Sequence, residues 1–346
     1  MIIILLSFLA LCLYGIKTNR VNSQPLELNQ SIALRGICAV EIMIGHVGLM
    51  TGSRVLYPNR KAGILFVGIF FMLSGYGVAY GVLNKSGYLK NFLARRIWRL
   101  LLPVYSAYVI YEVILIAVCK EAEWTAIFDI HMFCGSINWY VWEQMAFYVV
   151  FWVLYKICPD KTNILMVVLS VIFVGSAYVA GVENPCYGST LCFSLGLLYY
   201  KYEERAAQVI KKQFVLFIII CTVTLVLSMA TFFILGDRSM LGNPVARNIA
   251  SVSFGVGVLM LLSKYIVKNR VSYFLGKCSY EIFIVHPFVL TLFTKVEFAS
   301  WLFYSIASIG VSIGSAVALH FIVVWIMNLV ERMFHENHIN RTGLSL

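Results

Sequence analysis

Long apolar runs separated by short polar loops are the feature that most constrains how this chain can fold. A helix needs about 20 apolar residues to cross the hydrocarbon of a bilayer, and the chain has many runs near that length. Only 12% of the residues are charged and 61% are hydrophobic, whereas a soluble chain averages about 25% charged residues. The fold class predicted is therefore all-α, a polytopic membrane protein.

The apolar runs comprise an N-terminal segment and ten candidate spans. Met1–Ile16 has about 15 residues, which is short for a span, so we expect either an anchor or an interfacial segment. We expect three regions: the anchor and a polar link at 1–30, a membrane domain at 31–331, and a tail at 332–346. The ten candidate spans are Gly36–Gly52, Gly63–Leu83, Leu100–Cys119, Ile137–Tyr155, Ile164–Gly181, Cys186–Tyr200, Phe214–Leu235, Ile249–Tyr265, Tyr280–Val296 and Trp301–Val330.

The distribution of positive charge predicts an orientation. Lys and Arg fall in short clusters between the apolar runs, as they do in the cytoplasmic loops of membrane proteins. If Arg35 is cytoplasmic and the ten spans alternate, most of the 27 Lys and Arg residues fall on the inner side. This arrangement predicts a multipass protein of the plasma (cytoplasmic) membrane with a cytoplasmic C-terminus.

The net charge of +11 also bears on partners. The sequence has no basic face and no recognised nucleic-acid module, so we expect membrane lipids and not nucleic acid as partners. The oligomeric state stays open, a homo-oligomer included.

The cysteines and histidines do not indicate a metal site. Most of the nine cysteines lie inside apolar runs, where cysteine usually acts as a small buried hydrophobe. Cys119 with Cys134, or Cys186 with Cys192, would be able to pair outside the membrane, and the sequence leaves this open. No His-Glu-x-x-His or regular Cys/His ligand spacing is present, so no metal cofactor is predicted.

The run Leu34–Met50 contains three ionisable residues, Arg35, Glu41 and His46. Ionisable groups at bilayer depth are costly, seldom face lipid, and are functional candidates by default. Arg35 and His46 are eleven residues apart, so they return to nearly the same helix face roughly 16 Å apart along the axis. We predict that His46 is a catalytic general base, which can take a proton from a hydroxyl at neutral pH. The alternative is a histidine hydrogen-bonded to a neighbouring helix.

The other two residues of this run have alternatives as well. Arg35 shares a helix face with His46, but a cation at the predicted inner surface can also simply reflect the orientation of the helix or extend its side chain to the headgroups. Glu41 lies about 120° round the helix from Arg35, so we expect it to meet a different neighbour, as a buried pair partner or as a lesser site residue.

Basic residues gather in the predicted inner loop between Lys85 and Arg99. Arg96 and Arg99 are one helical turn apart and can face one ligand. A pair of guanidinium groups suits bidentate binding of phosphate, so both are candidate phosphate-binding residues. The alternative meaning of such a loop is attraction to anionic lipid.

Glu143 lies about one turn inside the run that opens at Asn138, on the predicted outer side. A carboxylate there can orient a hydroxyl acceptor or a histidine, so Glu143 is a second catalytic candidate. The alternative is a structural carboxylate near a helix N-terminus, where the helix dipole favours negative charge.

Ser74 and His286 are weaker candidates. Ser74 lies in Phe70–Gly81, where small residues recur at intervals of two to four, a pattern typical of close helix packing. It is not in a Gly-x-Ser-x-Gly nucleophile elbow. His286 precedes Pro287, whose missing N–H leaves a carbonyl free to contact other groups, so structural and functional readings both apply.

Taken in chain order, these residues resemble the motifs of the acyltransferase-3 family of integral membrane O-acyltransferases. The resemblance covers about Ser31 to Glu331, and its five parts in order are more specific than any one of them. The matching parts are Arg35 and His46 as Arg-x10-His, Phe70–Gly75 as Phe-Phe-x-x-Ser-Gly, Arg96–Arg99 as Arg-x-x-Arg, Trp139–Tyr148 as Trp-x-x-x-Glu-x-x-x-Phe-Tyr, and Ser279–His286 as Ser-Tyr-x-x-x-x-x-His.

The resemblance implies a ten-helix core, an acyl-CoA donor on the cytoplasmic side and a hydroxyl acceptor. His46 would be the catalytic base, Arg35, Arg96 and Arg99 would lie near the donor's phosphates, and Glu143 would lie at the acceptor side. The segment Met1–Ile16 is an addition to the family pattern, and Glu41 stands where an apolar residue is expected. Some members carry an extracytoplasmic hydrolase-like domain. Because this chain ends soon after its last apolar run, we expect it to acylate directly or to hand over to a partner.

We therefore predict an O-acetyltransferase that moves an acyl group from acetyl-CoA, or another acyl-CoA, to a carbohydrate or lipid-linked glycan acceptor. One rival is a transporter or flippase of a small or lipid-linked substrate, which would use the same buried charges as a path. Inverted-repeat halves would support that rival, and no clear repeat is visible in the sequence. Another is an inactive member of the family that acts as a scaffold.

Overall fold

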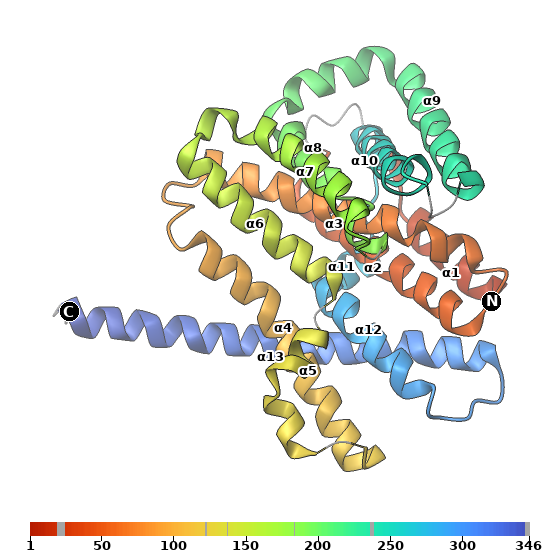
Figure 1. Ribbon diagram of the computed structural model, residues 1–346, viewed down its shortest axis with the longest axis vertical. Helices are drawn as coiled ribbons and strands as arrows, with labels where there is room; N and C mark the ends of the chain where they lie inside the picture. The colour runs from red at the N-terminus through yellow and green to blue at the C-terminus, as the bar shows by residue number, and fades with distance from the viewer. Residues whose placement is uncertain (19–24, 122, 137, 183, 236–238, 343–346) are drawn as a thin grey trace. The chain divides into compact units, whose positions relative to one another are not determined.

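A computed structural model of the chain describes residues 1–18, 25–121, 123–136, 138–182, 184–235 and 239–342. Within these residues the chain is helical apart from short connections and two strands of two residues each (Figure 1). Seven helices of this described part are long and apolar enough to cross a membrane. The prediction of an all-helical multipass membrane protein is thus confirmed, while the count of ten spans stays a prediction.

Apart from two short helices, at Ile130–Ser136 and Arg270–Lys277, the helices occupy the predicted apolar runs with shifted boundaries. Each of these helices begins or ends where a polar side chain, a glycine or a proline interrupts the run. Residues 343–346 of the predicted tail lie outside the described residues. The α-helices are α1 Ile2–Leu13, α2 Leu28–Thr51, α3 Tyr57–Asn84, α4 Phe92–Ile114, α5 Ile130–Ser136, α6 Trp139–Ile157, α7 Thr162–Val179, α8 Leu191–Lys201, α9 Glu203–Leu235, α10 Ala246–Lys264, α11 Arg270–Lys277, α12 Ser279–Phe293 and α13 Trp301–Thr342.

Two helices differ from the predicted spans in an informative way. The run Cys186–Tyr200 forms only the eleven-residue helix α8, because a turn precedes it. Helix α9 begins at Glu203, eleven residues before the predicted span, but it is kinked at Gln213, where the backbone leaves helical geometry (φ −132°). The apolar part predicted to start at Phe214 therefore begins at that kink.

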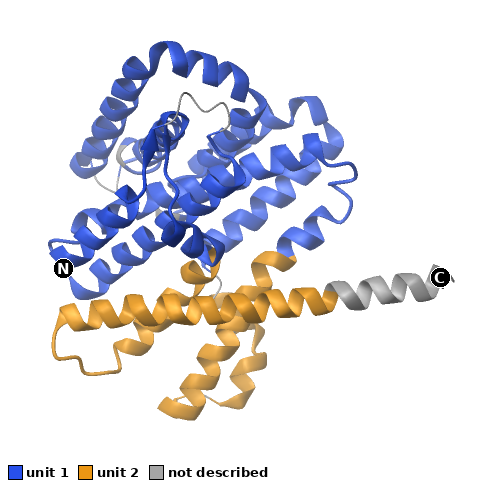
Figure 2. Ribbon diagram, turned by 180° about the vertical axis from the view of Figure 1, so that it is seen from behind, with its two compact units in different colours: residues 1–97, 138–279 blue, residues 98–137, 280–346 orange. Residues whose placement is uncertain are grey.

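The chain divides into two compact units (Figure 2). The first comprises Met1–Ile97 and Asn138–Ser279, and the second comprises Trp98–Ile137 and Tyr280–Leu346. The boundary between them falls inside α4, between Ile97 and Trp98. All but two of the predicted site residues, Arg99 and His286, belong to the first unit.

In the first unit, α3 packs against α2, α8 and α10, while α2 packs against α11 and α9 packs against α10. Aromatic side chains fill the space between α3, α6 and α8. The rings of Phe71 and Phe147 lie 5.1 Å apart, and Phe147 stacks on Phe193 at 4.7 Å. Phe71 and Phe193 are fully buried. This apolar packing holds the helices that carry most of the candidate residues.

Glycines allow two of these helix pairs to approach closely. A Cβ atom added at Gly276 of α11 would lie 1.8 Å from the carbonyl oxygen of Ile32 on α2. A Cβ atom at Gly75 of α3 would lie 2.1 Å from the carbonyl oxygen of Phe193 on α8. The close helix packing predicted for Phe70–Gly81 is therefore present, and it is carried by Gly75.

We expect Gly276→Ala to lower the Tm of the purified protein by several degrees. The added methyl group collides with rigid backbone, and such overpacking typically costs about 1–3 kcal/mol. The matched control is Gly175→Ala on α7, where an added Cβ meets nothing within 4 Å. Thermal unfolding in detergent measures both changes, and equal Tm values for the two variants would contradict the close approach of α2 and α11.

The N-terminal segment forms a short helix that is tied to the first unit. Helix α1 has 12 residues, so it rises about 18 Å, which is less than the ~30 Å thickness of a hydrocarbon core. Asn269 Nδ2 donates to the carbonyl oxygens of Leu11 (2.9 Å) and Tyr14 (3.1 Å). Strand β1 (Lys17–Thr18) then pairs with strand β2 (Tyr265–Ile266) in antiparallel fashion. This length favours the interfacial alternative for Met1–Ile16.

The second unit contains the rest of α4 with α5, α12 and α13. Tyr280 of α12 donates its hydroxyl to the carbonyl oxygen of Leu100 on α4 at 2.9 Å. The rings of Tyr111 and Phe288 lie 4.8 Å apart. Polar and aromatic contacts thus join α4 to α12 within this unit.

Candidate functional site

Helix α2 carries Arg35, Glu41 and His46, and both of its ends are fixed. Ser31 Oγ donates to the carbonyl oxygen of Leu26 at 2.7 Å, which holds the chain where the helix begins. The helix ends at Thr51, and Gly52 follows in the left-handed region (φ 62°), as is common at helix C-termini. His46 is half-buried.

A cavity of about 1130 Å³ opens beside α2 in the first unit. Arg35 forms part of its wall, and Lys85, Lys201 and Arg205 also line it. These four cations come from loops and helix ends that the sequence places on one side of the membrane, so the loops predicted to share a side do lie together. His46 and Arg96 are not among the lining residues.

The cavity wall is aromatic and carries acids as well as cations. Tyr76, Tyr80, Tyr200 and Tyr202 line it, together with the acidic residues Glu27, Glu203 and Glu204. The hydroxyl of Tyr76 donates to both carboxylate oxygens of Glu203, at 3.1 and 3.2 Å, and so joins α3 to the start of α9. The four cations are therefore nearly balanced by three carboxylates.

Glu41 faces α3 and is buried, with 2% of its surface exposed. Asn59 Nδ2 donates to Glu41 Oε1 at 2.7 Å. Glu41 thus meets a different neighbour from Arg35, as the helix geometry predicts, and its partner is an amide rather than a cation.

Arg96 is held by aromatic rings. Its guanidinium carbon lies 5.2 Å from the ring centre of Tyr148, 5.8 Å from that of Phe92 and 5.9 Å from that of Tyr88. Arg96 also donates a hydrogen bond to the Tyr88 hydroxyl. Arg35 lies within electrostatic range of Arg96 and Tyr148. Tyr148 is thus a ring partner of Arg96 and lies within electrostatic range of Arg35, the other predicted donor-binding cation of this unit.

Ser74 belongs to a chain of hydrogen bonds between α3 and α6. Gln144 Nε2 donates to Ser74 Oγ at 2.9 Å, and Ser74 Oγ and the Tyr148 hydroxyl share a hydrogen bond of 2.8 Å. Tyr148 thereby connects Ser74 to Arg96. These hydrogen bonds suit a supporting role for Ser74 beside the rings that surround Arg96, and a direct role of Ser74 stays untested.

Glu143 is buried on α6, with 7% of its surface exposed. Helix α6 begins at Trp139, after Asn138, whose side chain accepts a hydrogen bond from the N–H of Tyr140. Thr190, which is fully buried, donates its hydroxyl to Glu143 Oε1 at 2.6 Å. This short hydrogen bond fixes the position of the carboxyl group.

Comparison with known families agrees with the motifs. A family model described as an acyltransferase domain, that of the acyltransferase-3 family, matches residues 29–325. The chain belongs to the acyltransferase-3 family. It is therefore a membrane acyltransferase by family, and the match covers most of the chain. Comparisons with curated proteins and with solved structures gave no match.

Two predicted residues of this acyltransferase lie in the second unit. Arg99 is exposed, whereas Arg96 is held in the aromatic cage, so the two arginines of the Arg-x-x-Arg motif have different surroundings. His286 is fully buried, and its Nδ1 lies 2.9 Å from the carbonyl oxygen of Ile282 one turn earlier. That contact agrees with the structural reading of His286 and leaves a functional role untested.

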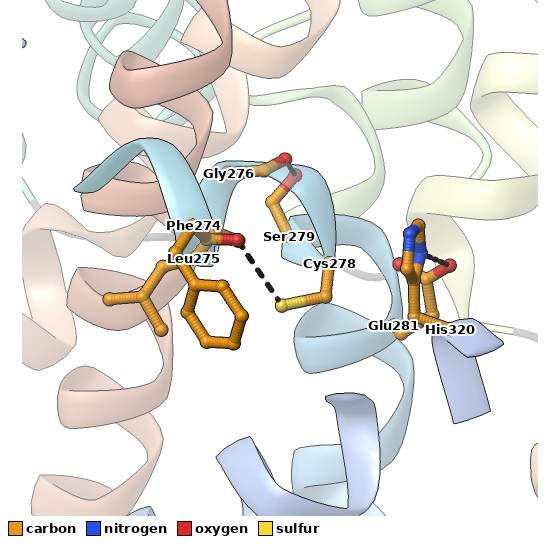
Figure 3. Close-up of polar contacts among 7 residues, drawn as sticks. All are labelled: Phe274, Leu275, Gly276, Cys278, Ser279, Glu281 and His320. Carbon is orange, nitrogen blue, oxygen red and sulfur yellow. Dashed lines mark hydrogen bonds and ion pairs between the residues drawn. The ribbon is translucent and has the colours of Figure 1, made fainter. Parts of the chain in front are cut away.

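One pair in the second unit was missed in the sequence. The Nδ1 atom of His320 lies 2.9 Å from Oε1 of the buried Glu281 (Figure 3). The two residues are 39 positions apart, and only the packing of α13 on α12 brings them together. Figure 3 also shows the turn before α12, where Ser279 Oγ donates to the carbonyl oxygen of Gly276 at 3.0 Å.

Thr190 and Asn248 are two polar residues of the first unit that the sequence did not indicate as part of the site. Both are almost completely buried, and neither belongs to a motif quoted for the acyltransferase family. The only sign of them in the sequence is that a polar residue stands inside an apolar run. Such a residue indicates a site only when its hydrogen-bond partner is known. Among the residues that the structure describes, no group of three His, Cys, Asp or Glu side chains is placed to hold a metal ion, and Cys119, Cys134 and Cys192 form no disulfide.

Proposed function

We propose that this acyltransferase moves an acyl group, most simply acetyl, from cytoplasmic acyl-CoA to a hydroxyl group of a surface polysaccharide or lipid-linked sugar. The observation that carries the proposal is the cavity bounded by Arg35, because Arg35 lies on the same helix as His46. The motif match supports acyl transfer, and the cavity supplies a place for the donor.

The size and chemistry of the cavity suit a donor of the acyl-CoA class. Ligand pockets usually have volumes of about 300–1,000 Å³, and this cavity, at about 1130 Å³, has room for a large ligand. Arg35, Lys85, Lys201 and Arg205 supply cations for phosphate groups. Because three carboxylates share the wall, donor binding would depend on pairing with individual cations rather than on a broad positive field.

Arg96 would add to the donor site. Its ring partner Tyr148 lies within electrostatic range of Arg35, and Arg96 would approach the phosphates or the thioester end of the donor. The exposed Arg99 is likewise a proposed phosphate-binding residue. Tyrosine rings hold Arg96 without neutralising it, so its charge stays available to an anionic ligand.

The chemistry requires one base and one leaving group. His46 would take the proton from the acceptor hydroxyl while its oxygen attacks the thioester carbonyl. The new C–O ester bond forms, the C–S bond breaks, and the proton passes from His46 to the departing thiolate to give free CoA. Glu143 would hold the acceptor, and the protein would lie in the plasma membrane with its C-terminus and the cavity on the cytoplasmic side.

Inside-out membrane vesicles supplied with radiolabelled acetyl-CoA test the proposal. We expect alkali-labile label on a glycan or lipid-linked glycan only when the protein is present, since an O-acyl ester is cleaved by mild base. A transporter or flippase would move its substrate and leave no covalent acetyl group on any product. Absence of labelled product from vesicles that contain folded protein and acceptor would overturn the proposed function.

A further inference from the structure

The carboxyl group of Glu143 is held through one oxygen only. Oε1 accepts the hydrogen bond from Thr190 at 2.6 Å, while Oε2 is buried and has no hydrogen-bond partner among the described residues. A buried acceptor without a partner is costly and calls for an explanation. The arrangement fixes the rotation of the carboxyl group and leaves one defined oxygen for a donor outside the chain.

Thr190 itself is held in place by α10. Asn248 Nδ2 donates to the carbonyl oxygens of Tyr187 (2.6 Å) and Pro244 (2.9 Å), and Asn248 Oδ1 accepts from the N–H of Leu191 (3.3 Å). Ser251 Oγ also donates to the carbonyl oxygen of Gly188 at 3.2 Å. These bonds bracket Thr190 on both sides, so its backbone has little freedom to move away from Glu143.

Two further buried oxygen atoms belong to the residues next to Glu143 and Thr190 in the sequence. Gln144 Oε1 and Ser189 Oγ are buried and have no hydrogen-bond partner within the described part of the chain. Gln144 is also anchored through its amide nitrogen to Ser74. Unsatisfied oxygen atoms on both sides of the contact between α6 and the turn before α8 suit a ligand that offers several hydroxyl donors, as a sugar does.

We propose that Thr190, kept in place by Asn248, is a positioning residue that aims Glu143 Oε2 at a hydroxyl group of a carbohydrate acceptor. This inference rests on the proposed acyl transfer. It adds to that proposal the residue that orients the carboxyl group of Glu143 toward the acceptor. The hydroxyl of Thr190 fixes Oε1, the backbone of the turn is fixed by α10, and Oε2 accepts the hydrogen bond from the sugar. Thr190 acts through Glu143 and touches no reacting atom.

Thr190→Val keeps the shape of the side chain and removes its hydroxyl, so it tests the contact directly. We expect kcat/KM for the acceptor to fall about ten- to a hundredfold, because the buried carboxyl group of Glu143 loses the hydrogen bond that fixes its orientation, while KM for acyl-CoA stays unchanged. Thr190→Ser should restore most of the activity, since it returns the hydroxyl. Thr231→Val on α9, an exposed threonine that bonds only its own helix, is the matched control.

A double-mutant cycle separates positioning from stability. If Thr190 acts through Glu143, then Thr190→Val should add little to the loss caused by Glu143→Gln, because the carboxyl that it aims is already gone. Isotope-edited infrared spectra of the carboxyl group give a readout that does not need turnover, and the Glu143 band should shift in Thr190→Val.

The outcomes distinguish this inference from the proposed function. Normal acceptor kinetics in Thr190→Val beside impaired Glu143→Gln overturn the role of Thr190 and leave the proposed function in place. Losses that multiply in the double mutant, with no rescue by Thr190→Ser, also overturn it. A wild-type protein that transfers no acyl group overturns the proposed function and the role of Thr190 together.

Discussion

A His46→Ala variant is expected to lose about 10²–10⁴-fold of the acyl-transfer rate, which is the usual contribution of a positioned general base. The loss should appear in kcat, because the imidazole acts on the acceptor proton during the attack and does not line the donor cavity. KM for acyl-CoA should change little. The rate of label transfer from acetyl-CoA to acceptor in vesicles measures the effect.

The control for this variant is His131→Ala, which removes an exposed histidine of α5. It should transfer acyl groups at the wild-type rate. If His46→Ala, folded and present at normal levels, also worked at the wild-type rate, His46 would be a structural histidine and the base would have to be sought elsewhere.

Gly77→Leu is expected to raise KM for acyl-CoA at least tenfold or to abolish donor binding. Gly77 lies on α3 and lines the cavity, and a Cβ added there meets nothing within 4 Å, so the leucine side chain would enter the open space. Leucine is also a better helix former than glycine by about 1 kcal/mol, so the helix itself should be stabilised. Titration with labelled acyl-CoA measures the affinity.

Gly175→Leu on α7 is the matched control, since Gly175 also has open space around it and does not line the cavity. Its affinity for acyl-CoA should equal that of the wild type. Unchanged donor affinity in Gly77→Leu would show that the donor does not occupy this cavity.

The sequence predicted the membrane class, the apolar runs and the candidate residues because these depend on local composition and spacing. Helix α2 illustrates this success: Arg35, Glu41 and His46 lie on one helix, and Glu41 meets a different neighbour from Arg35, as a periodicity of 3.6 residues requires. The close packing at Gly75 was likewise visible in the spacing of small residues.

Contacts between distant segments were not predictable in the same way. Thr190 and Glu143 are 47 residues apart. Their hydrogen bond depends on the turn before α8, which Asn248 of α10 holds by hydrogen bonds to its backbone. The run Cys186–Tyr200 is apolar enough to suggest a full span, but the same turn shortens α8 to eleven residues. Backbone groups of the turn bind the side chain of Asn248 and so do not take part in helix hydrogen bonds.

The composition of the cavity wall was also not predictable from the sequence. Its wall combines α2, α3 and the junction of α8 and α9, and the sequence predicted only that the cations of these segments share one side of the membrane. That Tyr76 binds Glu203, and that three carboxylates offset the cations, depends on side-chain packing that no spacing rule contains.

The measurement that tests the central claim most directly is photolabelling of the purified protein with an acyl-CoA that carries a photoreactive acyl chain. If the donor enters beside Arg35, peptides from residues 73–85 and 200–205 should carry the label. Excess unlabelled CoA, present during irradiation, should prevent this labelling, and so should Gly77→Leu. Labelling confined to other segments, in a protein that still transfers acyl groups, would contradict the account.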